Sequence, residues 1–84
     1  MRSLRNIDRV LAAASTNKDG EITYKDYGLL LCETHVLRQE ARQTLSPRTF
    51  RDLVEDLREL EDVRIGKNRQ ERALERIWRA YARK

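Results

Sequence analysis

Residues 15–26, with the sequence STNKDGEITYKD, place oxygen-bearing side chains at the spacing of a calcium-binding EF-hand loop. Asn17 and Asp19 occupy the third and fifth positions of that pattern, and Gly20 occupies the position of the sharp turn. Calcium binds to oxygen ligands, so this spacing predicts a cation site. The candidate ligands are the side chains of Ser15, Asn17, Asp19 and Asp26 and the backbone carbonyl of Glu21.

The two ends of this loop depart from the calcium-binding pattern. Ser15 stands where an aspartate is usual, and Asp26 is one methylene shorter than the glutamate that normally grips the ion with both oxygens. Affinity follows the number of charged ligands, and only Asp19 and Asp26 supply carboxylates. We therefore expect calcium affinity to be roughly millimolar at best.

The alternative is that the segment only connects two helices. In that case Asp19 and Gly20 form a tight turn. Ile22 then packs as a short extended residue, and Thr23 caps the next helix. EF-hand loops usually work in pairs, but residues 61–72 cannot form a second one because apolar side chains would fill its ligand positions.

A basic stripe is predicted near the end of the chain. At about 100° per residue, five arginines stack on one helical face, opposite the apolar face that includes Ile77. Such a face suits carboxylate or phosphate partners, on an acidic protein or an anionic membrane surface. The arginines are Arg69, Arg72, Arg76, Arg79 and Arg83.

The alternative for this stripe is an ordinary solvated face. Glu75 can pair with Arg79 one turn away, and the segment 52–62 carries six acidic residues against one arginine. The two charged segments could therefore pair internally. Nucleic acid is a disfavoured partner, because no aromatic residues interleave with the arginines.

Catalysis has little support in the sequence. Cys32 and His35 are neighbours on a predicted helix, but no third group is identified that would orient the imidazole. We expect a mostly buried thiol beside a histidine at the edge of the core. No catalytic residue is predicted, and calcium is the only cofactor considered.

The 84 residues, of which 39% are hydrophobic and 38% charged, predict a single folded domain, residues 1–84. The longest apolar run, residues 10–14, is far shorter than the roughly 20 residues that cross a bilayer. One cysteine cannot form an internal disulfide, so a reducing compartment is favoured.

Apolar residues recur at three- and four-residue intervals in four blocks, which predicts an all-α fold of four helices. The expected helices cover residues 4–14, residues 24–43, a segment that opens at Pro47, and residues 68–82. Gly66 marks either the end of the third helix or the turn after it. The first two are joined by the EF-hand-like loop. Their apolar faces contain Leu4, Ile7, Leu11 and Ala14; Tyr27, Leu30, Leu37 and Ala41; Phe50, Leu53, Val54, Leu57 and Leu60; and Leu74, Ile77, Trp78 and Tyr81.

Two further features of these helices are predicted. Ser3, Thr23 and Ser46 are placed to cap the first three. The 24–43 helix carries a second apolar stripe nearly opposite the first, which predicts that it is the central and most buried helix. This second stripe consists of Leu29, Cys32 and Val36.

Four stretches in this order resemble the C-terminal part of the nuclear control of ATPase protein 2 family. They are LRNIDRVL at 4–11, DGEITYKDYGLLL at 19–31, FRDLVEDLREL at 50–60 and ERIWRAY at 75–81. The resemblance implies a soluble tail of a longer mitochondrial, membrane-anchored protein. It also implies a link to expression of ATP synthase subunits and, in plant members, to lipid homeostasis, but no biochemical activity.

The leading hypothesis is therefore a non-catalytic helical interaction module that docks a protein partner or an anionic membrane surface through its basic face. A tail tethered at a membrane gains effective concentration for such weak contacts. The alternative hypothesis is a degenerate EF-hand that binds or senses calcium.

Overall fold

Four α-helices build the chain in the computed structural model, which describes residues 2–81. They are α1 (Arg2–Ala13), α2 (Tyr24–Thr44), α3 (Pro47–Leu60) and α4 (Lys67–Tyr81), with a short 3₁₀ helix, η1 (Val63–Ile65), before α4. The predicted all-α fold is confirmed. The predicted end of the last helix at residue 82 lies outside the described residues.

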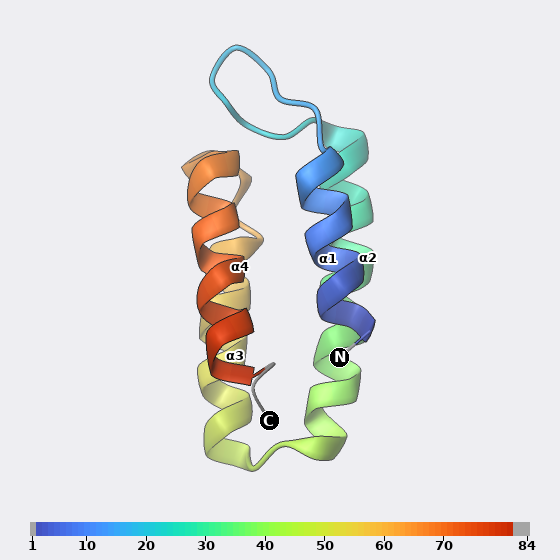
Figure 1. The fold of residues 1–84 in the computed structure, drawn as a ribbon, viewed down its shortest axis with the longest axis vertical. Coiled ribbons are helices and arrows are strands. Elements are labelled where there is room, and N and C mark those ends of the chain that lie inside the picture. Colours follow the sequence, from blue (N-terminus) through green and yellow to red (C-terminus); the bar gives the residue numbers. More distant parts are fainter. Residues whose placement is uncertain (1, 82–84) are drawn as a thin grey trace.

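The helices alternate in direction and form an elongated antiparallel bundle of 40 × 18 × 17 Å (Figure 1). Helix α1 packs against α2 and α4, and α3 packs against α2 and α4. Each helix therefore occupies a corner, with two neighbours and one outward face, as short connections between antiparallel helices favour.

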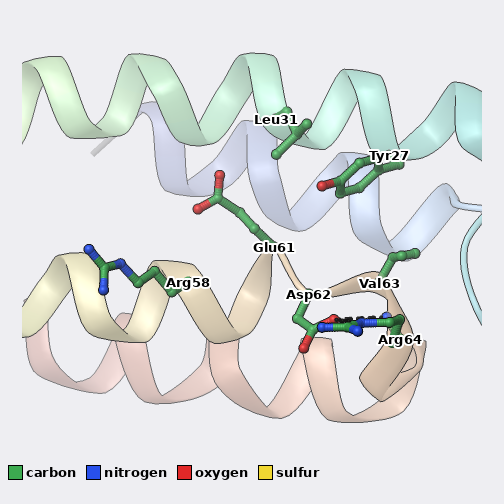
Figure 2. A pocket seen from close by; sticks show the side chains of 7 residues that line it. All are labelled: Tyr27, Leu31, Arg58, Glu61, Asp62, Val63 and Arg64. Atoms are coloured by element: carbon green, nitrogen blue, oxygen red, sulfur yellow. Dashed lines mark hydrogen bonds and ion pairs between the residues drawn. The ribbon is translucent and has the colours of Figure 1, made fainter.

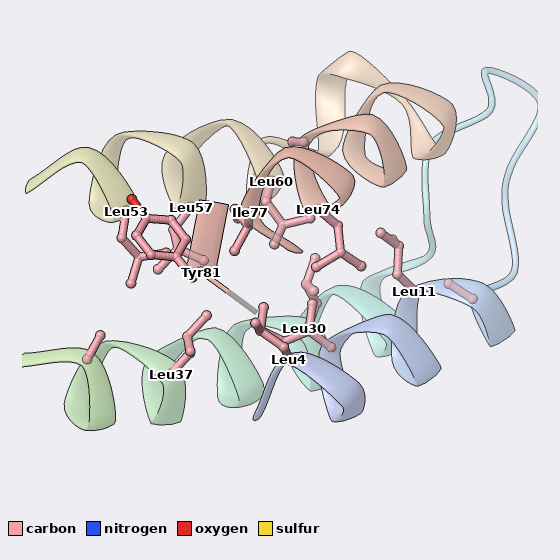
Figure 3. Packing of buried hydrophobic residues seen from close by; sticks show 14 of the residues in the cluster. Leu4, Leu11, Leu30, Leu37, Leu53, Leu57, Leu60, Leu74, Ile77 and Tyr81 are labelled. Atoms are coloured by element: carbon pink, nitrogen blue, oxygen red, sulfur yellow. The ribbon is translucent and has the colours of Figure 1, made fainter. Parts of the chain in front are cut away.

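The core lies along the axis of the bundle, where the apolar faces of all four helices meet (Figure 3). The periodicity of apolar residues in the sequence predicted most of these core residues, because one apolar stripe on each helix faces inward. Leu30 and Leu37 of α2 and Ile77 of α4 are fully buried. The remaining fully or almost fully buried apolar residues are Leu4, Ile7, Leu11, Ala14, Ile22, Ala41, Leu53, Leu57, Leu60, Ala73, Leu74 and Tyr81.

The predicted helix starts are confirmed in part. Ser46 caps α3, since its Oγ accepts a hydrogen bond of 3.3 Å from the N–H of Thr49, and Pro47 follows in the first turn. Thr23 precedes α2, but its hydroxyl makes no capping bond to the backbone. The prediction for Ser3 is wrong, because α1 already begins at Arg2 and Ser3 is buried within it.

The prediction that α2 is the central, most buried helix is also wrong. Leu29 and Val36 are 49% and 44% exposed, and Cys32 is exposed as well. The reason is the corner position of α2: it turns Leu30, Leu37 and Ala41 to the core, so a stripe nearly opposite them faces solvent.

Candidate docking face and connecting loop

The predicted basic stripe lies on the outer side of α4. Arg69, Arg72, Arg76 and Arg79 are all exposed, while Ile77 on the opposite side of the helix is buried. The fifth predicted member, Arg83, lies outside the described residues. The four arginines are on one exposed side of the helix, as the spacing predicted.

Two of these arginines are engaged by acidic side chains of the domain itself. Arg76 forms an ion pair with Glu59 of α3, and Arg79 pairs with Glu75 at 2.7 Å one turn earlier in α4. Within residues 2–81, no salt bridge engages Arg69 or Arg72. The stripe is therefore divided into a paired part and an unpaired part.

The acidic flank of α3 lies beside the paired part. Burial raises the pKa of the Asp56 carboxyl above its ordinary value; Arg76 opposes this rise, whereas the neighbouring carboxylate of Glu59 adds to it. Burial, with smaller contributions from Asp56 and Asp52, also raises the pKa of Tyr81. The ion pair between Arg76 and Glu59 confirms the predicted internal pairing between the third and fourth helices.

Helix α1 adds positive charge next to α4. Arg2, Arg5 and Arg9 are exposed on the side of α1 that faces away from its buried residues. Because α1 and α4 are neighbours, the outward faces of both helices contribute to one side of the bundle. These arginines were not included in the predicted docking residues, because sequence spacing within one helix cannot show which other helix lies beside it.

The connecting loop between α1 and α2 is held by its own polar groups. The side-chain Oδ1 of Asn17 accepts hydrogen bonds from the N–H groups of Asp19 at 2.9 Å and Glu21 at 3.1 Å. Thr16 and Ile22 form a short antiparallel bridge, and Ile22 is buried against the core. The Asn17 oxygen proposed as a cation ligand is therefore already an acceptor of two hydrogen bonds.

Asp26 closes the loop at its other end. Its Oδ2 accepts hydrogen bonds of 2.9 Å from the N–H of Ser15 and from the hydroxyl of Thr23. These bonds, the one from Ser15 first, lower the pKa of the Asp26 carboxyl. Among residues 2–81, no three His, Cys, Asp or Glu side chains are grouped in a way that could hold a metal ion. Calcium binding at Ser15, Asn17, Asp19, Glu21 and Asp26 stays a prediction.

The tip of the loop contacts the start of α4. The backbone N–H of Lys67 donates to the carbonyl of Gly20 at 2.9 Å, and its Nζ donates to the carbonyls of Ala12 and Ala14 at the end of α1. A positive charge is favourable there, because carbonyl groups at a helix C-terminus lack partners. Lys67 thus links the start of α4 to the end of α1 and to the connecting loop.

A shallow groove of about 530 Å³ lies between α2 and the end of α3 (Figure 2). Glu61, the residue that follows α3, projects into it; it forms an ion pair with Arg38 of α2 and accepts a hydrogen bond of 3.0 Å from the hydroxyl of the buried Thr34. The bond to Glu61 raises the pKa of Arg38. Sequence alone placed Glu61 in the acidic segment 52–62 and did not predict this contact. The groove is lined by Tyr27, Leu31, Arg58, Glu61, Asp62, Val63 and Arg64.

The expected environment of Cys32 and His35 is not found. Both residues are exposed, so the prediction of a mostly buried thiol at the edge of the core is wrong. The Nε2 of His35 lies 3.5 Å from the side-chain nitrogen of Gln39. Both residues are exposed because they lie on the side of α2 that faces away from the core.

The fold and the charged surface define a small all-α four-helix domain with an outer basic face. Residues 1–81 match the family described as ATP synthase regulation protein NCA2, and the chain belongs to this family. Membership links it to regulation of ATP synthase and so to the mitochondrion. Searches of curated proteins and of solved structures returned no match. None of the helices within residues 2–81 has the length and apolar character needed to cross a bilayer.

Proposed function

We propose that this domain is a non-catalytic interaction module that docks onto an anionic membrane surface through the outer side of α1 and α4. The observation that carries the proposal is the pair of exposed arginines, Arg69 and Arg72, that no acidic residue of residues 2–81 engages. An arginine without an internal partner keeps its full capacity for phosphate groups of another surface.

The distribution of the charges favours a flat partner over a compact acidic site. The basic residues follow the outward faces of two neighbouring helices in a bundle 40 Å long, and none of them lines the groove between α2 and the end of α3. Basic residues near an anionic bilayer contribute about 1 kcal/mol each, and this contribution does not require a shaped site. An acidic protein partner is the competing outcome.

Vesicle flotation tests this function. The domain should float with vesicles that contain an anionic phospholipid, should remain unbound with neutral vesicles, and should be released as salt rises from about 50 to about 500 mM. Equal flotation with neutral and anionic vesicles, or none with either, would contradict the proposal. Capture by an acidic protein in the absence of vesicle binding would favour the competing partner.

A second candidate function is calcium binding in the connecting loop, whose tip is joined to α4 by the hydrogen bond from Lys67 to Gly20. An ion that reorganised the loop would act directly on the start of α4. Asp26, with its lowered pKa, supplies a carboxylate at neutral pH. An NMR titration with calcium should then give saturable shifts in residues 15–26 that Asp19→Ala abolishes. Small, diffuse shifts would leave the loop as a connector.

A further inference from the structure

The outward stripe of α2 has the spacing of a coiled-coil seam. Leu29, Cys32 and Val36 follow one another at intervals of three and four residues, and all three are exposed. Lys25, Gln39 and Gln43 extend the same alternation of intervals at both ends, and they are exposed too. In heptad notation Leu29, Val36 and Gln43 are a positions, and Lys25, Cys32 and Gln39 are d positions.

The two flanks of the seam differ in charge. One flank, at the e positions, carries Asp26, Glu33 and Glu40, whereas the other, at the g positions, carries His35 and Arg42. This difference selects an orientation, because e and g side chains of two helices face each other across a seam. We propose that the domain forms a homodimer in which α2 of one copy packs in parallel against α2 of a second copy.

The parallel arrangement pairs compatible side chains of the two copies across the seam. It places Leu29, Cys32 and Val36 each against the same residue of the second copy, and it brings His35 near Glu40 of that copy. An antiparallel pair would instead place the acidic e flanks together, so that Glu33 would lie near Glu33 of the other copy. Like charges at that distance are destabilising.

Because the seam of α2 matches itself in this way, a second copy of the domain is favoured over other partners for it. The apolar part of the seam is short, with polar side chains at both ends, so the interface is of the small and transient class. We expect a dissociation constant of roughly 10–100 µM. The dimer leaves α4 uncovered, because the seam and the basic face are on different helices, so this inference does not depend on the proposed membrane docking.

Sedimentation velocity tests the dimer. The chain should shift from monomer to dimer between about 1 and about 500 µM. The double variant Leu29→Lys/Val36→Lys should weaken association at least tenfold, whereas Tyr24→Lys, which changes a 93% exposed residue outside the seam, should not. Circular dichroism should show unchanged helicity in both variants. A monomer at every concentration, or a dimer that the double variant does not weaken, would overturn the proposal.

Cross-linking with a short bismaleimide tests the orientation. Lys25→Cys/Cys32→Ser should cross-link rapidly, because a parallel seam places the two copies of residue 25 side by side. An antiparallel seam with Glu33 facing Glu33 would separate them by about 24 Å, at a rise of 1.5 Å per residue. The control is Ala13→Cys/Cys32→Ser, with an exposed thiol at the end of α1. Equal rates for the two variants would overturn the parallel arrangement.

Discussion

Arg76 of α4 and Glu59 of α3 form an ion pair across the second helical hairpin. This pair lies within the row of arginines that sequence spacing alone presents as uniform. Arg76 therefore serves the contact between two helices, whereas Arg69 and Arg72, which have no such partner among residues 2–81, are available to another molecule. Substitutions in the two groups should therefore have different effects.

Arg76 should control the ionisation of Asp56. Burial raises the pKa of the Asp56 carboxyl, and the positive charge of Arg76 counteracts this rise. The substitution Arg76→Gln should therefore raise the pKa of Asp56 further, as measured by carbon-13 NMR of the carboxyl group. Because both partners of the Arg76–Glu59 pair are well exposed, its loss should cost less than about 1 kcal/mol of stability. An unchanged Asp56 titration would contradict this assignment.

The contact of Glu61 with Arg38 and Thr34 should stabilise the packing of α2 against α3. Arg38 and Glu61 retain only 29% and 16% of their side-chain exposure, and Thr34 is fully buried. Arg38→Ala would leave the acceptor oxygens of Glu61 without this donor. We expect a loss of about 1–3 kcal/mol in the free energy of unfolding, measured in urea.

A matched control exists for this experiment. Arg64 pairs with Asp62 nearby, but its side chain is 85% exposed. Arg64→Ala should therefore change the free energy of unfolding by less than about 0.5 kcal/mol. Equal losses for Arg38→Ala and Arg64→Ala would show that burial does not distinguish the two pairs.

Two glycines should respond to alanine with opposite signs. Gly66 has φ 90°, which an L side chain rarely adopts, and an added Cβ would lie 3.6 Å from the carbonyl oxygen of Gly20. That distance is an ordinary contact, so the backbone conformation decides the outcome, and Gly66→Ala should destabilise the domain by about 1–2 kcal/mol.

Gly28 is the comparison residue, since it lies within α2 and an added Cβ would meet nothing within 4 Å. Gly28→Ala should stabilise the domain by about 0.5–1 kcal/mol, because alanine is the better helix former. Thermal unfolding of both variants checks the pair. A stabilising Gly66→Ala would be incompatible with the left-handed conformation at this corner.

The connecting loop should loosen in acid. Hydrogen bonds from Ser15 and Thr23 hold the pKa of Asp26 below its ordinary value of 3.8. A carboxyl with a lowered folded-state pKa contributes stability above its unfolded pKa and loses that contribution as pH falls through the folded one. Unfolding measured from about pH 6 to about pH 2.5 should show this loss, and Asp26→Asn should make the curve flatter. Parallel curves for the two proteins would contradict the role of Asp26.

The interior of the bundle could be predicted from sequence where one apolar stripe defines a helix. In α1, Leu4, Ile7 and Leu11 lie on one face of the helix, and that face is buried in the structure. Helix α2 carries two apolar stripes, and periodicity alone could not show that Leu29 and Val36 face solvent. That choice depends on how many neighbours the helix has, which is a property of the whole bundle.

The charged contacts could be predicted only in part. Complementary charge of α3 and α4 indicated that the hairpin pairs internally, but the selection of Arg76 depends on the rotation of both helices. The contact of Glu61 with Arg38 joins residues 23 positions apart, on helices whose relative position no local pattern defines. The loop sequence indicated its turn at Gly20 but not the contact of that glycine with Lys67, which is equally non-local.

The most direct test of the proposed docking is the partition of the domain into anionic vesicles after charge reversal. Arg69→Glu/Arg72→Glu should lower the partition coefficient at least tenfold, since each basic residue contributes about 1 kcal/mol near the surface. Arg48→Glu/Arg51→Glu makes the same charge change at exposed positions of α3 and should lower it less than about threefold. Equal losses in the two variants, or no loss in either, would contradict docking through the α1 and α4 side.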